Sequence, residues 1–126
     1  MADKPWKAFE REVATLFGGH RHPANQGGRV DVTGPVAVVQ CKHVRVLSLE
    51  ALTKLATEMQ TIGEEYYDKL SAGVVAVKVR RGAGRASPTL VVMTADVFRK
   101  HYRRSEEGAT TYAKDVAIGF VVGAVP

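Results

Sequence analysis

The stretch "VDVTGPVAVVQCKH", Val30 to His43, decides the fold. Its valines predict two β-strands, over about 29–33 and 36–43, and Gly34–Pro35 marks a tight turn between them. Three polar residues interrupt this apolar pattern: Asp31, Gln40 and Lys42. Because charged side chains are rarely buried without a partner, these residues are expected to offset one another or to bind a shared ligand.

The geometry of a hairpin brings the three polar residues together. Side chains alternate between the two faces of a strand, so Gln40 and Lys42 share a face with Val36 and Val38, and Cys41 points the other way. Strands joined by a tight turn are antiparallel, which places Asp31 opposite the end of the second strand. Carboxylate and amide oxygens suit Mg²⁺, which uses few carboxylates and keeps several waters. We therefore predict that Asp31, the Gln40 side-chain oxygen and the Cys41 backbone carbonyl bind the metal.

The rest of the chain predicts helices around this hairpin. An amphipathic helix is expected over 4–17, ended by Gly18–Gly19, and a longer helix over 49–69, capped by Ser48. Further strands are expected at 72–79, 89–94 and near the C-terminus, with a third helix from Thr94 or Asp96 to Arg104 and a possible extra strand near His20. This order predicts a mixed sheet flanked by helices, in which the strand after the long helix lies parallel to 36–43.

The pattern Asp31, then Gln40-Cys41-Lys42, resembles the PD-(D/E)xK nuclease superfamily in the variant where Gln replaces the acid. Glu10, in "WKAFEREVA", fits the helical acid that the family carries before its first strand. The resemblance is to Mrr-type restriction nucleases and Holliday junction resolvases, and it covers roughly residues 4–100. It implies a restriction-endonuclease-like fold with an α-β-β-β-α-β core. Val30, where the family often has proline, and Gln40, which removes one anionic ligand, depart from its pattern.

The resemblance implies a metal-dependent DNA endonuclease, using Mg²⁺ or Mn²⁺ in its place. The catalytic residues would be Glu10, Asp31, Gln40 and Lys42, and Glu10 would reach the metal, through water or directly. Lys42 would sit beside the attacking water and help to deprotonate it. The alternative is a DNA-binding module that keeps the fold but binds metal too weakly to cut.

Composition agrees with a nucleic-acid partner. The net charge is +5, and the segment from Lys69 to Arg104 holds nine basic residues and one acid. The alternative is a solvated surface on a mildly basic protein. The residues predicted to contact DNA are Arg29, Arg80, Arg81 and Arg85. The alternative for Arg80, Arg81 and Arg85 is that they lie at an exposed hairpin tip and bind nothing. A further basic group lies on the third predicted helix and is either a solvated face or a binding face: Arg99, Lys100, Arg103 and Arg104.

Structural alternatives remain open for the site residues. Asp31 could bond backbone N–H groups at a turn, Glu10 could be a solvated helix residue, and Lys42 could extend from the strand end to water. Cys41 is expected to be a small core residue, and His20 and His22 are expected to be surface residues rather than metal ligands.

The length of 126 residues predicts one domain, with 105–126 as a C-terminal extension. Residues 117–125 of this extension are a candidate strand or dimer surface, since symmetric cutting of two strands by one small domain would need a homodimer. No signal-peptide core or membrane-length apolar run is present, which favours a cytoplasmic protein, and the single cysteine excludes an internal disulfide.

Overall fold

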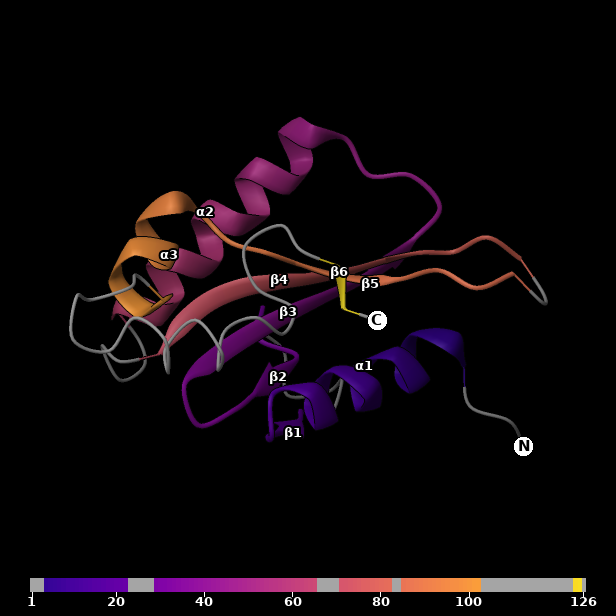
Figure 1. The fold of residues 1–126 in the computed structure, drawn as a ribbon, viewed down its shortest axis with the longest axis horizontal. Helices are drawn as coiled ribbons and strands as arrows, with labels where there is room; N and C mark the ends of the chain where they lie inside the picture. The colour runs from indigo at the N-terminus through magenta and orange to yellow at the C-terminus, as the bar shows by residue number, and fades with distance from the viewer. Residues whose placement is uncertain (1–3, 23–28, 66–70, 83–84, 103–123, 126) are drawn as a thin grey trace.

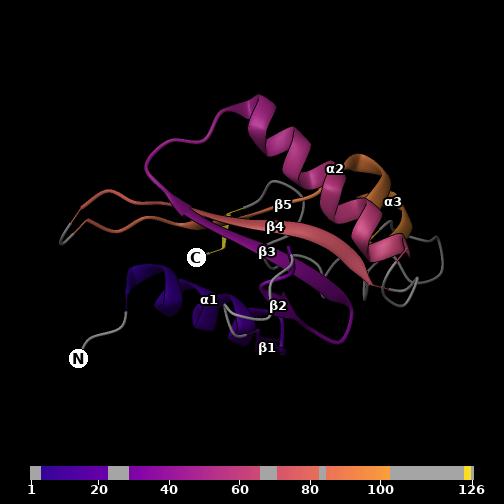
Figure 2. The same ribbon diagram turned by 180° about the vertical axis from the view of Figure 1, so that it is seen from behind.

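A mixed β-sheet with helices on both faces forms the fold (Figures 1 and 2). The computed structural model describes residues 4–22, 29–65, 71–82, 85–102 and 124–125. The elements are α1 (Pro5–Leu16), β1 (His20–Arg21), β2 (Val32–Thr33), β3 (Ala37–Val44), α2 (Leu49–Glu65), β4 (Ala72–Val79), β5 (Thr89–Val92), α3 (Ala95–Tyr102) and β6 (Ala124–Val125). The predicted mixed α/β class and the predicted element order, including a strand at His20, are confirmed.

The sheet runs in the order β1-β2-β3-β4-β5-β6. Only β3 and β4 are parallel, paired from Ala37↔Ala72 to Val44↔Val79, because α2 carries the chain back over one face between them. The β2–β3 pair is antiparallel, with Val32 opposite Val39, as the Gly34–Pro35 turn predicts. Helix α1 covers the opposite face from α2, and α3 lies beside α2 (Figures 1 and 2).

Two apolar layers hold the helices to the sheet. On the α1 face, Phe9 and Val13 pack with Val39 and Val74, and Cys41 packs against this layer. On the α2 face, Met59 packs with Val38. The strand alternation predicted for β3 is therefore confirmed, with Val38 and Cys41 on opposite faces.

The close approach of α2 to β4 depends on Gly73. A Cβ atom built on Gly73 would lie 1.7 Å from the Met59 carbonyl oxygen, so no larger residue fits at this crossing. The helix descends toward the sheet along its length and begins away from it (Figure 1). Helical spacing predicts an apolar stripe on this helix that begins with Leu49, and for Leu49 the prediction is wrong: it lies where the helix begins and is 79% exposed. Val36, expected to pack with Val38, is likewise 57% exposed, because it precedes β3 in the turn.

The element ends follow local chemistry. Gly18 adopts a φ of 64° just after α1, a left-handed conformation that glycine tolerates. The Ser48 hydroxyl accepts a hydrogen bond from the Ala51 N–H at 3.0 Å, which confirms the predicted cap of α2. The Thr94 hydroxyl caps α3 in the same way.

Parts of three predicted elements lie outside the described residues, at 66–69, 103–104 and 116–123. Of the predicted terminal strand, Ala124–Val125 pair with β5. Among the described helices, none combines the length and the apolar character needed to cross a membrane.

Candidate functional site

Asp31 lies at the point where β2 begins to pair with β3. Val32 packs on the α1 face and Val30 on the α2 face. In a regular strand these two side chains would share a face, so the strand alternation is broken at Asp31, one residue before β2. Its N–H donates to the Val39 carbonyl, and its Oδ2 accepts a hydrogen bond of 2.8 Å from the Cys41 N–H. The Asp31 carboxylate thus accepts the hydrogen bond from the Cys41 N–H that a backbone carbonyl of a longer β2 would accept.

This contact also locates the Cys41 carbonyl. The N–H and C=O of one strand residue point to the same edge, so the Cys41 carbonyl faces the edge where Asp31 lies. Two of the predicted oxygen ligands therefore share one edge of β3. The alternative role for Asp31, a carboxylate bound to a backbone N–H, is also present in this arrangement, and a single carboxylate can fill both roles.

Glu10 is buried on α1, with 8% of its surface exposed. This overturns the alternative that it is a solvated helix residue. Its Oε1 accepts a hydrogen bond of 3.1 Å from Arg21 Nε and lies 3.0 Å from Arg21 Nη2. Strand β1 therefore supplies a guanidinium that neutralises Glu10, while Glu12, two residues on, is exposed and pairs with Lys78 at 3.1 Å.

Gln40 has a buried side-chain oxygen, Oε1, with no hydrogen-bond partner among the described residues. Gln40 directly follows Val39, which pairs with Val32 and accepts the hydrogen bond from the Asp31 N–H. Leaving a buried acceptor unpaired costs about 1–3 kcal/mol, so such groups in native proteins generally have an unseen partner. Lys42, two residues on, is half-buried on the same face.

The two carboxylates interact electrostatically, and the charge of Lys42 acts on Asp31. Burial raises the pKa of Glu10, and the Asp31 charge raises it further, against the opposing hydrogen bond from Arg21. Burial also raises the pKa of Asp31, against the Cys41 N–H bond and the nearby charge of Lys42. The pKa of the Cys41 thiol is raised by burial and by both carboxylates, so the sulfur stays protonated and is no thiolate ligand.

The residues present fit a hard divalent cation in their chemistry. Burial raises the pKa of both carboxylates, and the Gln40 oxygen has no partner among the described residues. No group of three His, Cys, Asp or Glu side chains suited to a metal is found within the described ranges. The fit therefore depends on two carboxylates supplemented by amide and backbone oxygens.

The predicted DNA contacts divide between two regions. Arg80 and Arg81 follow β4, Arg85 precedes β5, and all three are exposed. Arg29 comes from the segment before β2 and lies 3.6 Å from Glu58 of α2. Arg99 and Lys100 are exposed on α3, while 103 and 104 lie outside the described residues.

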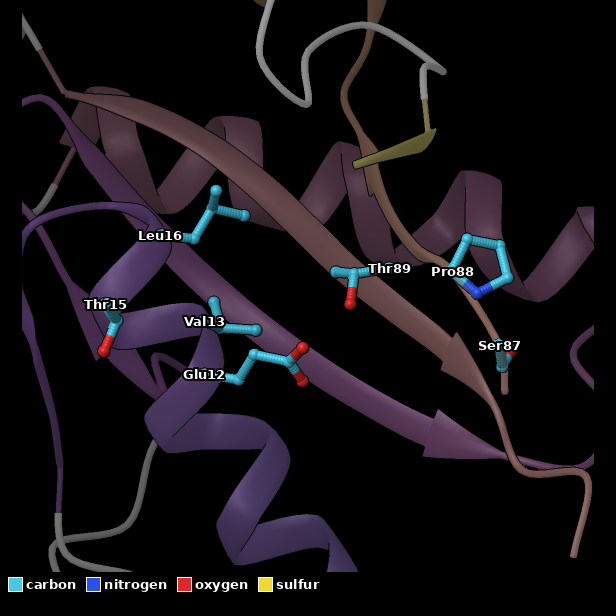
Figure 3. Close-up of a pocket in the computed structure, with 7 residues that line it drawn as sticks. All are labelled: Glu12, Val13, Thr15, Leu16, Ser87, Pro88 and Thr89. Carbon is cyan, nitrogen blue, oxygen red and sulfur yellow. The ribbon is translucent and has the colours of Figure 1, made fainter. Parts of the chain in front are cut away.

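Two hollows lie on the α1 side of the β4–β5 region. One of about 300 Å³ lies between α1 and the start of β5, lined by the seven residues in Figure 3. The other, of about 430 Å³, lies beside Arg80, Arg81 and Arg85. Neither includes Asp31 or Gln40.

Sequence reasoning missed Arg21, which it treated only as the residue between two histidines. Of the two histidines, His20 is exposed, whereas His22 is half-buried, forms a hydrogen bond of 2.6 Å with the Thr33 hydroxyl and contacts the His20 ring. The pairing of Arg21 with Glu10 depends on how β1 packs against α1, and no local pattern signals it.

No family model, curated protein or solved structure matches this chain.

Proposed function

We propose that the chain is a metal-dependent DNA endonuclease that hydrolyses phosphodiester bonds, with a restriction-endonuclease-like fold and a PD-(D/E)xK site in its QxK form. One set of observations supports this above all: the Asp31 charge acts on Glu10, the Lys42 charge acts on Asp31, and the Gln40 oxygen, on the α2 face of β3, is buried and unpaired among the described residues. An apolar sheet gains no stability from such a group, whereas a phosphate-cleaving centre requires one.

In this proposal Asp31, Gln40 and the Cys41 carbonyl hold Mg²⁺, or Mn²⁺ in its place, and Glu10 reaches it directly or through water. The bound cation would polarise a phosphate oxygen and offset the charge that develops during in-line attack. Lys42 orients the attacking water and takes part in its deprotonation, and its positive charge partly neutralises the negative charge of the phosphate. Asp31 is held in place for this by the Cys41 N–H.

The DNA partner follows from the charge distribution. Arg80, Arg81 and Arg85 extend from the same side of the sheet as α1, and their charges are exposed to an approaching phosphate backbone. One domain holds one such site, so cutting both strands symmetrically, as at a Holliday junction, requires a homodimer.

A second function is favoured by the Glu10–Arg21 ion pair. The guanidinium already neutralises one of the two carboxylates, and Gln40 supplies no charge. A DNA-binding module that binds metal weakly and does not cut would have these same features.

The deciding experiment incubates plasmid, single strands and a four-way junction with the protein in Mg²⁺, Mn²⁺ or EDTA. We expect metal-dependent cleavage, and Lys42→Ala should slow it about 10²–10⁴-fold, as is typical of a positioned proton-transfer group, with DNA binding kept. Lys54→Ala, an exposed lysine of α2, is the matched control and should cut at the wild-type rate. Binding without cleavage in either metal would leave the non-cutting module. A Lys42→Ala variant that cuts normally would remove Lys42 from the site.

A further inference from the structure

A hollow of about 430 Å³ is lined by residues from the ends of β3 and β4, from the start of α1 and from the β4–β5 connection. Figures 1 and 2 show that the start of α1 and this connection lie at the same end of the sheet. Four cations line it: Lys78, Arg80, Arg81 and Arg85. No acid lines it, although Glu12 pairs with Lys78 from α1. The hollow therefore carries a net positive charge even after that pair is counted.

Two polar atoms in the wall of this hollow lack partners. The Ser87 hydroxyl oxygen and His43 Nδ1 are both buried, and neither has a hydrogen-bond partner among the described residues. The structure has three such side-chain atoms in its described part, and the third is the Gln40 oxygen. Because an unpaired buried hydroxyl is costly, the position of Ser87 in a basic hollow points to a ligand that accepts a hydrogen bond.

The His43 ring contacts Phe9 of α1, which holds it against the wall of the hollow. A ligand here meets cations on several sides and a hydroxyl at the base.

The form of the hollow favours a phosphate group over a carboxylate. Arginine guanidinium groups bind both anions, but the open connection between β4 and β5 suits a group that is part of a long chain. Gly82, with a φ of 95°, has open space around its Cα and permits close approach of a ligand to the backbone. His43 directly follows Lys42 in β3, so the hollow adjoins the candidate site.

We propose that this hollow binds one backbone phosphate of a nucleic-acid strand, a phosphate other than the one that is cleaved. Ser87 and Lys78 join the arginines as its ligands, although neither is suggested by the sequence. This inference rests on the proposed function in taking DNA as the partner, but it does not require that the protein cuts DNA.

The test measures binding of a short labelled duplex by fluorescence anisotropy in EDTA, over a series of salt concentrations. Arg81→Ala should weaken binding and reduce the log–log salt slope by about 0.9, the value for one phosphate contact. Ser87→Ala should weaken binding about tenfold with an unchanged slope, since it removes one hydrogen bond to a charged oxygen and no charge. Lys54→Ala and Thr57→Ala, exposed on α2 on the other face of the sheet, are the matched controls.

Thermal unfolding of each variant keeps folding separate from binding, and Ser87→Ala removes an unpaired hydroxyl, so its folded state should not lose stability. Wild-type affinity and slope in both Arg81→Ala and Ser87→Ala would overturn the inference. The same groups could instead bind a free phosphate ion, and calorimetry with inorganic phosphate measures this binding. Phosphate binding that is lost in both variants, with unchanged duplex affinity, would also overturn it. If both variants weaken DNA binding as expected but the protein never cuts DNA, the proposed endonuclease activity is contradicted and the phosphate site is not.

Discussion

The unpaired oxygen of Gln40 makes Gln40→Met a sharp test of the candidate site. Methionine has a similar volume and shape to glutamine, so the packing around position 40 should change little. The substitution removes a buried acceptor without a partner among the described residues, whose cost is about 1–3 kcal/mol. In EDTA the variant should therefore be more stable than the wild type by this amount. At about 4 °C per kcal/mol for a domain of this size, its Tm should rise by about 4–12 °C.

Divalent metal should reverse or cancel this advantage. A ligand at one hundred times its Kd stabilises the folded state by about 2.7 kcal/mol, and the wild type should gain this from Mg²⁺ or Mn²⁺. Gln40→Met should gain less, because it has lost a ligand oxygen. Gln40→Glu, which adds a charge beside Asp31, should reach the same gain at a lower metal concentration.

The control for this experiment is Gln60→Met on α2. The Gln60 Oε1 accepts a hydrogen bond of 2.7 Å from the Thr94 hydroxyl, so the same substitution at a partnered glutamine should lower stability in EDTA. The assay is urea unfolding with and without metal. If Gln40→Met is no more stable than the wild type in EDTA, or gains as much from metal, the buried oxygen is no metal ligand.

Three further predictions concern the two buried acids, the Glu10–Arg21 ion pair and the packing of α2. Burial raises the pKa of Asp31 and Glu10, so the folded protein binds these two protons more tightly than the unfolded chain does. The free energy of unfolding should therefore fall as the pH rises from about 4 through the raised pKa values. Asp31→Asn should flatten this fall in EDTA, and an equally steep fall would show that Asp31 is not its source. Arg21→Ala should destabilise the wild type by about 0.5–3 kcal/mol more than it destabilises the Glu10→Gln variant. A double-mutant cycle with no coupling energy would show that the ion pair does not contribute to stability. Met59→Ala should cost about 2–5 kcal/mol in urea unfolding because Met59 is fully buried, whereas Leu49→Ala, at the same helix's exposed start, should stay within about 0.5 kcal/mol; equal losses would contradict the packing of α2.

The sequence by itself determined the local structure of this protein. The valine runs, the Gly34–Pro35 turn and the Ser48 cap predicted the hairpin and α2, because alternation, turn chemistry and capping act over a few residues. The same local rules placed Asp31 opposite the end of β3, where its carboxylate binds the Cys41 N–H, since an antiparallel register is set by its turn. Glu10 stands one helical turn after Trp6, a spacing that predicts a position beside the apolar residues of α1, and its burial agrees.

Only the tertiary structure decided which groups share a neighbourhood across long separations. The pairing of Arg21 with Glu10 and the wall that joins Lys78, Ser87 and His43 depend on how β1, α1 and the β4–β5 connection pack on the sheet. The exposure of Leu49 likewise follows from the descent of α2 toward Gly73, where the absence of a side chain permits contact. Periodicity identifies the apolar face of a helix, but the angle at which the helix crosses the sheet decides how much of that face is covered.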